Sequence, residues 1–358
     1  RYQIADDGCG MDSQEIHKYF NKLSSSGHNL AVAGGNHGLG AKVSTLYWNQ
    51  AGVLVLSWKN GVGVMAKIWK DSRSNVKTYG RYGLAPFELD DGSFTEFVEA
   101  PAEMKPDFIK DHGTVIILTG DTGNEDTWQG PIGASGEPVL DKVYSHLTAI
   151  NARFFRVPKD VNFTVHYMKE KKSDWPRSEA DARNRSRDTE RVYWTRAVNG
   201  MESQLLADSL EHGTLTHPEF KIHWYWLNPQ RPSIPYFVQG SFVASLYQDE
   251  IYDLHRYRTA SSYMGLFGIY RKPVQQNLAI IVEPNPEFLM TDSARSRLMD
   301  SRIAERNTTE KLPWSDVYGP FFKENMPPVI RAALETISND SSNEELTRAI
   351  AEDMKEYA

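Results

Sequence analysis

Two groups of residues near the start of the chain have the types and spacing needed to bind a purine nucleotide. In the first group, Asp6 is followed by Gly8 and Gly10. A carboxylate at the end of a buried strand can accept a hydrogen bond from the amino group of adenine. Glycines beside it let the backbone turn tightly where a side chain would collide with the base. We therefore expect Asp6, Gly8 and Gly10 to form the base-binding end of a pocket.

The second group is a glycine cluster at 34–42, one amphipathic run (13–23) and one polar loop (24–29) later in the chain. Gly35, Gly38 and Gly40 would expose a row of backbone N–H donors at the start of a helix. The helix dipole also favours a phosphate group there. A carboxylate and two spaced glycines, followed about one helix later by such a cluster, are what a nucleotide pocket without a Walker loop requires.

These motifs resemble the nucleotide boxes of one ATPase superfamily. The pair DxGxG and GxxGxG is similar to the second and third boxes of the GHKL ATPases, which include topoisomerases, mismatch-repair clamp ATPases, heat-shock chaperones, MORC proteins and sensor histidine kinases. The run GGNHGLGAKVSTLY is most similar to the type IIB topoisomerase and MORC versions. His112, Gly113 and Thr114 precede an apolar run and resemble a further box. The resemblance covers about the first 165 residues well and the remainder loosely.

The resemblance implies an ATP site with Mg²⁺ bridging the phosphates. Asp6 would read adenine, Met11 would pack on the base, and Thr114 would support the pocket from the sheet. The residues implied at the phosphates are Gly35, His37, Gly38, Leu39, Gly40 and Lys42. The family's water-activating glutamate and magnesium-binding asparagine are not found in the chain, and we expect them upstream of Arg1. The rival interpretation is a degenerate nucleotide binder that does not hydrolyse ATP.

Two cations are candidates for a contact with the terminal phosphate. Arg295 lies in TDSARSRL, which resembles the arginine-bearing loop of the chaperone branch, although Asp292 replaces an asparagine. Lys272, in the run YRKP, is similar in position to the switch lysine of the topoisomerase branch. Either cation would neutralise charge on the phosphate. Each cation also has a purely structural interpretation, as a helix-cap or surface cation.

The succession of elements predicts an α+β protein. The resemblance implies a GHKL (Bergerat) ATP-binding α/β sandwich with a mixed sheet at 1–168 and a transducer-like α/β domain at 200–310. Between them, the interleaved charges of 169–199 favour a solvated linker or loop over a DNA contact. A helical segment follows at 311–358. We expect an Asn-Gly hairpin turn at 59–61, strands at 220–227 and 263–270, a helix at 293–305, and Ser13 as a helix cap.

Composition excludes several classes of protein. The chain has 358 residues, 40% of them hydrophobic, which is enough for more than one packed core. The net charge of −7 provides no global positive field for nucleic acid. The single cysteine, Cys9, excludes an internal disulfide and fits a reducing compartment. No apolar run reaches membrane-spanning length, so we expect a cytoplasmic protein that makes no membrane contact.

By resemblance, ATP would close a lid and pair two protomers, and the transducer would act on a DNA or protein client. Two alternatives use the same pocket. A binding module could use ATP only as a conformational switch, without hydrolysis. A sensor histidine kinase is disfavoured, because no phosphoacceptor helix precedes the pocket and a large α/β unit follows it.

Overall fold

A computed structural model describes residues 2–20, 45–46, 49–71, 81–123, 127, 143–170, 191–232, 238, 240–291, 297–304 and 311–337. The chain divides into two compact units, one ending at Lys142 and the other beginning at Val143. Each unit has its own sheet and its own core.

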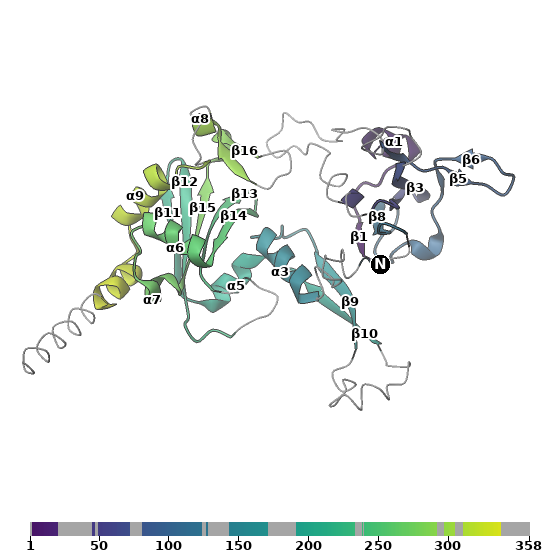
Figure 1. The fold of residues 1–358 in the computed structure, drawn as a ribbon. Helices are drawn as coiled ribbons and strands as arrows, with labels where there is room; N and C mark the ends of the chain where they lie inside the picture. Colours follow the sequence, from purple (N-terminus) through teal and green to yellow (C-terminus); the bar gives the residue numbers. More distant parts are fainter. Residues whose placement is uncertain are drawn as a thin grey trace, which may run out of the picture. The chain divides into compact units, whose positions relative to one another are not determined.

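The first unit is built on an antiparallel sheet in the order β1-β8-β2-β3-β4, with β7 also pairing with β3 (Figure 1). Its elements are β1 (Gln3–Asp6), α1 (Ser13–Phe20), β2 (Val53–Lys59), β3 (Val62–Asp71), β4 (Arg81–Leu84), β5 (Phe87–Glu88), β6 (Phe94–Thr95), β7 (Val98–Glu99), η1 (Ala102–Met104) and β8 (Gly113–Leu118). β2 is apolar along most of its length and is the most buried strand of the five. β1 lies at the edge of the sheet, and all four of its residues are exposed.

Helix α1 packs on one face of this sheet through Ile16, which is fully buried. Its cap is Asp12 rather than the expected Ser13. Asp12 Oδ1 accepts a hydrogen bond from the Glu15 amide at 2.9 Å, and Glu15 Oε2 accepts one from the Asp12 amide at 3.0 Å. This reciprocal pair is a capping box. Lys59 Nζ on β2 bonds both carboxylate oxygens of Glu15 at 2.7 Å, which joins the start of the helix to the sheet.

The predicted hairpin turn between β2 and β3 is confirmed. Asn60 and Gly61 have φ values of +53° and +79°. Both central residues of a type I′ turn need positive φ, and asparagine and glycine tolerate it best. The turn sets the register in which Lys59 faces Val62 and Val53 faces Ile68.

The second unit contains a mixed sheet in the order β11-β12-β15-β13-β14, in which β13 and β15 are parallel and the other pairs are antiparallel. Its elements are α3 (Val143–Arg153), β9 (Thr164–Glu170), β10 (Arg191–Ala197), α5 (Met201–Asp208), β11 (Ser209–His217), β12 (Phe220–Leu227), β13 (Phe242–Tyr247), β14 (Glu250–Arg256), α6 (Tyr257–Leu266), α7 (Lys272–Gln275), β15 (Leu278–Pro284), η4 (Pro286–Phe288), β16 (Leu289–Thr291), β17 (Leu298–Asp300), α8 (Ser301–Ala304), a π-helical turn η5 (Trp314–Tyr318), α9 (Gly319–Glu324) and a helix at 328–337. The strand predicted at 220–227 is confirmed as β12.

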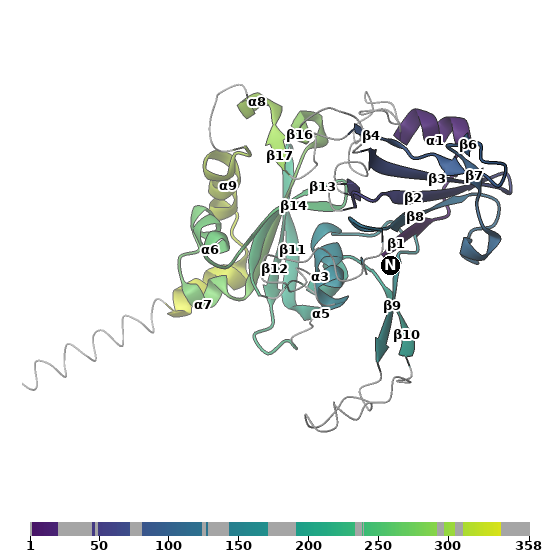
Figure 2. The same ribbon diagram turned by 45° about the vertical axis from the view of Figure 1, so that its right-hand side comes forward.

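Helices cover both faces of this sheet, as Figure 2 shows, with α6, α7 and α9 on one side and α3 and α5 on the other. Alternate residues of β12 therefore enter two different cores. Trp224 packs with the α6 and α9 layer, and Tyr225 packs with the α3 and α5 layer. Both side chains are buried, so the aromatic stripe serves packing, as expected.

The division between the units falls earlier in the chain than the boundary expected at 169–199. β9 and β10 pair along seven residues, from Thr164 opposite Ala197 to Glu170 opposite Arg191. They flank the charged segment at 171–190, which lies outside the described residues. The strands on either side of that segment therefore belong to one unit.

One local prediction is wrong and another holds only in part. Residues 263–270 were expected to form a strand, but 257–266 form α6, whose residues Ala260 and Met264 are buried with Phe267 in the core. A helix was expected at 293–305; in the described part of this range, 298–300 form β17, which pairs with β16, and 301–304 form the helix α8. Packing of α6 in the core and strand pairing in the β16–β17 hairpin override local preference.

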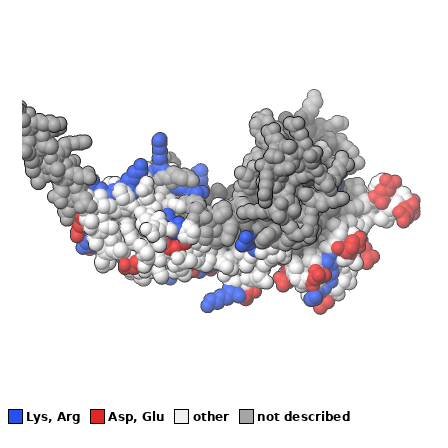
Figure 3. Space-filling view, turned by 90° about the horizontal axis from the view of Figure 1, so that it is seen from below, with Lys and Arg blue, Asp and Glu red and all other residues white. Residues whose placement is uncertain are grey.

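The predicted α+β class with a mixed sheet is confirmed. The parallel pair lies in the sheet of the second unit, whereas the described strands of the first sheet, which was expected to be mixed, pair only antiparallel. Within the described ranges, no helix is both long and apolar enough to cross a bilayer. On the face shown in Figure 3, Asp and Glu side chains are more prominent over the first unit and Lys and Arg over the second. Local charge therefore differs between the units, although the chain as a whole is acidic.

Candidate functional site

The residues expected at the base-binding end come together where three strands of the first sheet lie side by side. Asp6 is the last residue of β1 and faces Thr114 on β8. Thr114 in turn faces Ser57 on β2. Asp6 is exposed, whereas Thr114 and Ser57 are buried. The sheet thus places an exposed carboxylate at the end of a row of buried hydroxyl groups. β1 itself is an exposed edge strand in the described residues, not the buried strand expected.

Ser57 links this row to the turn that follows β1. Its hydroxyl accepts a hydrogen bond from the Met11 amide at 2.8 Å and donates to the Gly113 carbonyl at 3.1 Å. The Thr114 hydroxyl lies 3.0 Å away. Because the single Ser57 proton is directed to Gly113, Thr114 is the donor in that contact. Sequence reasoning missed Ser57, although one polar residue within the apolar run VLVLSWK was a usable signal.

The turn after Asp6 requires glycine for two separate reasons. The Gly8 amide donates to Asp6 Oδ1 at 2.9 Å, and a Cβ on Gly8 would lie 2.7 Å from that oxygen. Gly10 has φ of +63°, and a Cβ there would lie 1.8 Å from the carbonyl oxygen of Trp58. Gly10 therefore allows the turn to lie directly against β2. Met11, next in the chain, is partly buried and packs against the same core as α1.

The electrostatics of Asp6 suit an acceptor on the rim of a pocket. Partial removal of water by the surrounding protein raises the pKa of Asp6, the Gly8 amide opposes this, and the negative charge of Asp7 adds to it. Oδ1 already accepts the Gly8 amide, whereas Oδ2 has no hydrogen bond to any described residue. This second oxygen is available to a donor on a ligand, such as an exocyclic amine.

The structure does not describe the residues that were predicted to bind the phosphates. Gly35, His37, Gly38, Leu39, Gly40 and Lys42 all lie outside the described residues. So does Arg295. Their assignments remain predictions from the sequence. Of the residues expected at the site, the structure brings together Asp6, Gly8, Gly10, Met11 and Thr114.

Lys272 and the hairpin that contains the Arg295 loop lie at opposite ends of β15. Lys272 is exposed on α7, just before β15 begins at Leu278. Thr291 faces Leu298 at the base of the β16–β17 hairpin, which follows the other end of β15. At about 3.3 Å per residue, the seven residues of β15 separate these ends by roughly 20 Å. Lys272 and the described residues of this hairpin therefore lie beyond opposite ends of β15.

Asp253 anchors the base of that hairpin, and sequence reasoning did not single it out. It lies at an irregularity of β14 with φ of +46°. Its Oδ2 accepts the Ser245 hydroxyl at 3.1 Å and lies 3.5 Å from the Leu298 amide. Burial raises the pKa of Asp253, while these contacts and the charges of His255 and Arg297 lower it. The side chain therefore connects β13, β14 and β17 at the point where the hairpin loop ends.

The described residues include no group of three or more His, Cys, Asp and Glu side chains placed to hold a metal ion. Mg²⁺ bound together with nucleotide usually keeps several water ligands and is held largely by phosphate oxygens. The side-chain arrangement in the described ranges thus provides an acceptor for a base, and no preformed cage for a cation.

No protein-family model matches the chain, and no curated protein matches it. The solved structures that are similar to the chain include the following three. The 43K ATPase domain of Thermus thermophilus gyrase B, in complex with an aminocoumarin, is 13% identical over 98% of this chain and 83% of that one, with a TM-score of 0.39. The N-terminal domain of a DNA repair protein is 11% identical over 90% and 85%, with a TM-score of 0.43. The ATPase region of Saccharomyces cerevisiae topoisomerase II, bound to ICRF-187, is 10% identical over 94% and 76%, with a TM-score of 0.41.

Two of these similar chains are ATPase regions of the kind that the glycine motifs resemble. With identities below 25% and TM-scores below 0.5, these likenesses carry no weight for the function of this chain.

Proposed function

We propose that this chain is a GHKL-type ATPase that binds ATP at the end of β1. The observation that carries the proposal is the turn from Asp6 to Met11. One oxygen of its exposed carboxylate has no hydrogen bond to any described residue. A Cβ on Gly8 or Gly10 would lie within 3 Å of neighbouring atoms, and the Met11 amide donates to Ser57. An adenine amino group donates to Asp6, and the base lies over the turn beside Met11.

The glycine cluster at 34–42 and Lys42 bind the phosphates through backbone amides and the lysine ammonium group. Mg²⁺ neutralises part of the phosphate charge when bound with ATP. Arg295, on the hairpin anchored by Asp253, contacts the terminal phosphate, and Lys272 is the alternative. Hydrolysis also needs a general base that activates the attacking water.

ATP binding closes a lid hinged at 24–29 and pairs two protomers, and the second unit transmits this closure to a DNA or protein client. The phosphate groups complete the link between the lid and the pocket, so the closed state depends on bound nucleotide. The protein acts in the cytoplasm. A module that uses ATP binding without hydrolysis as its switch is the alternative function.

Phosphate release by the full-length protein tests the enzymatic part. An ATPase should release phosphate only with Mg²⁺. The release should be lost in the Asp6→Asn variant and retained in the Asp7→Asn variant. Asp7 is a matched control because it is also exposed and carries the same charge one residue away. Tight ATP binding and nucleotide-dependent crosslinking of two protomers, without phosphate release, would support the switch instead. Failure to bind ATP at all would refute both.

A further inference from the structure

A small pocket in the second unit is built around an arginine that is held rigidly. Arg302, on α8, donates through Nε to Asp300 Oδ1 at 3.0 Å and through Nη2 to Asp300 Oδ2 at 2.7 Å. Asp300 is 2% exposed. The guanidinium group also lies over the ring of Phe288, 4.1 Å from its centroid. A bidentate carboxylate and an aromatic ring fix the plane of the guanidinium group, so its remaining donors point in defined directions.

The third contact of Arg302 is exchangeable. Nη1 bonds Glu219 Oε1 at 3.1 Å, and the two side chains are 44% and 47% exposed. Ion pairs between side chains as exposed as these add little to stability. Glu219 lies in the turn between β11 and β12, at the rim of the pocket. It can therefore turn to solvent at little cost and leave Nη1 open.

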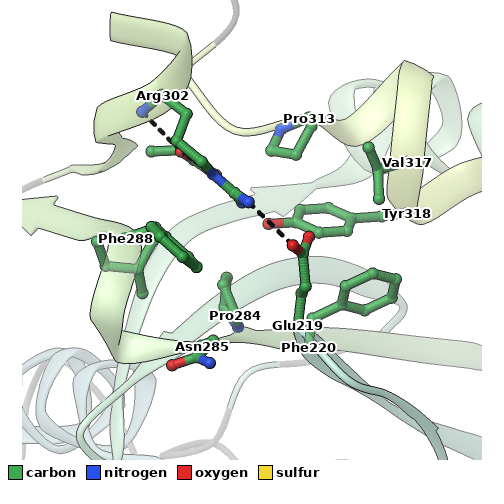
Figure 4. Close-up of a pocket in the computed structure, with 11 residues that line it drawn as sticks. Glu219, Phe220, Pro284, Asn285, Phe288, Arg302, Pro313, Val317 and Tyr318 are labelled. Atoms are coloured by element: carbon green, nitrogen blue, oxygen red, sulfur yellow. Dashed lines mark hydrogen bonds and ion pairs between the residues drawn. The ribbon is translucent and has the colours of Figure 1, made fainter.

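The pocket also contains a hydroxyl group with no acceptor. Tyr318, on the π-helical turn η5, is 3% exposed and lines the pocket. Figure 4 shows its hydroxyl beside the contact between Arg302 and Glu219. Among the described residues, this hydroxyl makes no hydrogen bond. Burial, with the nearby charge of Asp300, raises the pKa of Tyr318, so the group stays protonated and is a donor at neutral pH. The Tyr318 hydroxyl is not one of the fully buried side-chain groups that lack a hydrogen-bond partner, so it remains reachable and can donate to an acceptor that enters the pocket.

The free groups of the pocket define the chemistry of its ligand. A guanidinium group has five N–H donors, and Arg302 uses one each at Nε, Nη1 and Nη2. The remaining N–H groups of Arg302 and the Tyr318 hydroxyl are all donors, and Glu219 already shows that a carboxylate fits at Nη1. The buried negative charge of Asp300 disfavours a dianion such as phosphate.

We propose that this pocket binds a carboxylate group, which replaces Glu219 at Nη1 of Arg302 and accepts a hydrogen bond from the Tyr318 hydroxyl. Glu219 is then a resident competitor that occupies the site when no ligand is present. A small organic acid, the C-terminus of a polypeptide and an acidic side chain share this chemistry.

Titrations of the full chain, followed by calorimetry or NMR, test the proposal with propionate as the probe. Because Glu219→Gln removes the competitor, we expect propionate to bind about tenfold more tightly to that variant than to the unchanged protein. In the Glu219→Gln background, Tyr318→Phe should weaken binding about fivefold through one lost hydrogen bond, and Arg302→Lys by tenfold or more. Glu287→Gln is the matched control, because Glu287 is exposed on η4 and does not line the pocket.

The sources of the carboxylate are separated by three short peptides of otherwise equal sequence. One has a free C-terminus, one an amidated C-terminus, and one an amidated C-terminus with an internal glutamate. Binding of propionamide as strong as that of propionate would overturn the proposal. So would equal propionate affinity of the unchanged and Glu219→Gln proteins, or no binding to either. Thermal unfolding identifies any variant that fails to fold. If Arg302→Lys does not fold, Tyr318→Phe still tests the proposal, because it leaves the Asp300–Arg302 ion pair unchanged.

Discussion

Replacing Gly10 with alanine tests whether the turn after β1 lies against β2 as described. The φ of +63° costs an alanine about 1–2 kcal/mol of folding free energy. The added Cβ would also lie 1.8 Å from the carbonyl oxygen of Trp58 and 3.2 Å from the Gly113 nitrogen. Both neighbours are backbone atoms within a paired sheet, so relief needs a backbone shift that costs a further ~1–3 kcal/mol. We expect Gly10→Ala to lose about 2–5 kcal/mol.

Gly61→Ala separates the two contributions. Gly61 has a similar φ of +79°, in the turn between β2 and β3, but a Cβ there would meet nothing within 4 Å. It should therefore lose only the conformational cost of about 1–2 kcal/mol. Urea unfolding of both variants, with the m-value checked for a change in the unfolding transition, measures the difference. Equal losses in the two variants would refute the close contact between the turn and β2.

Three further predictions concern buried polar contacts. Ser57→Ala should cost about 2 kcal/mol in urea unfolding and weaken ATP binding, because it leaves the Met11 amide without its acceptor at 2.8 Å; an unchanged stability would contradict the role of Ser57. The hydrogen bond from His223 lowers the pKa of Glu283 below its ordinary value of 4.5, with burial opposing it. The folded state then holds fewer protons than the unfolded one, so this contribution to stability is complete above about pH 4.5 and is lost as the pH falls further. Glu283→Gln should flatten the fall in stability over that acid range. An unaltered profile of stability against pH would contradict the contribution assigned to Glu283. Arg156→Lys should cost about 1 kcal/mol in thermal unfolding, because lysine cannot keep both 2.6 Å contacts with the Glu202 carboxylate.

Where local chemistry decides the structure, the sequence was sufficient to predict it. Asn60 and Gly61 specify a turn whose φ values few other residues adopt easily, and that turn is present. The strand at 220–227 alternates strongly enough for its bounds to be predicted without error. The grouping of Asp6, Gly8 and Gly10 also follows from their spacing, since one turn of chain brings them together.

Where distant contacts decide the structure, the sequence was not sufficient. The run at 263–270 is rich in aromatic and aliphatic residues typical of strands, but Ala260, Met264 and Phe267 are buried at successive turns of helical spacing. Ser57 matters because the turn after β1 and strand β8 reach it from 46 and 57 residues away, respectively. Asp253 gains its role from a hairpin 45 residues later. A local pattern marks Ser57 as a polar residue in an apolar run, but the partners of Ser57 and Asp253 are not visible in any local pattern.

The central claim is that the carboxylate of Asp6 recognises an adenine base. Calorimetric titration of ATP and GTP into the full-length protein and its Asp6→Asn and Asp7→Asn variants tests it most directly. We expect ATP to bind the unchanged protein and the Asp7→Asn variant with similar affinity. Asp6→Asn should lower the affinity for ATP at least tenfold. GTP should bind the unchanged protein more weakly than ATP does, because guanine has no amino group at the same position. Equal ATP affinity in all three proteins would contradict the account.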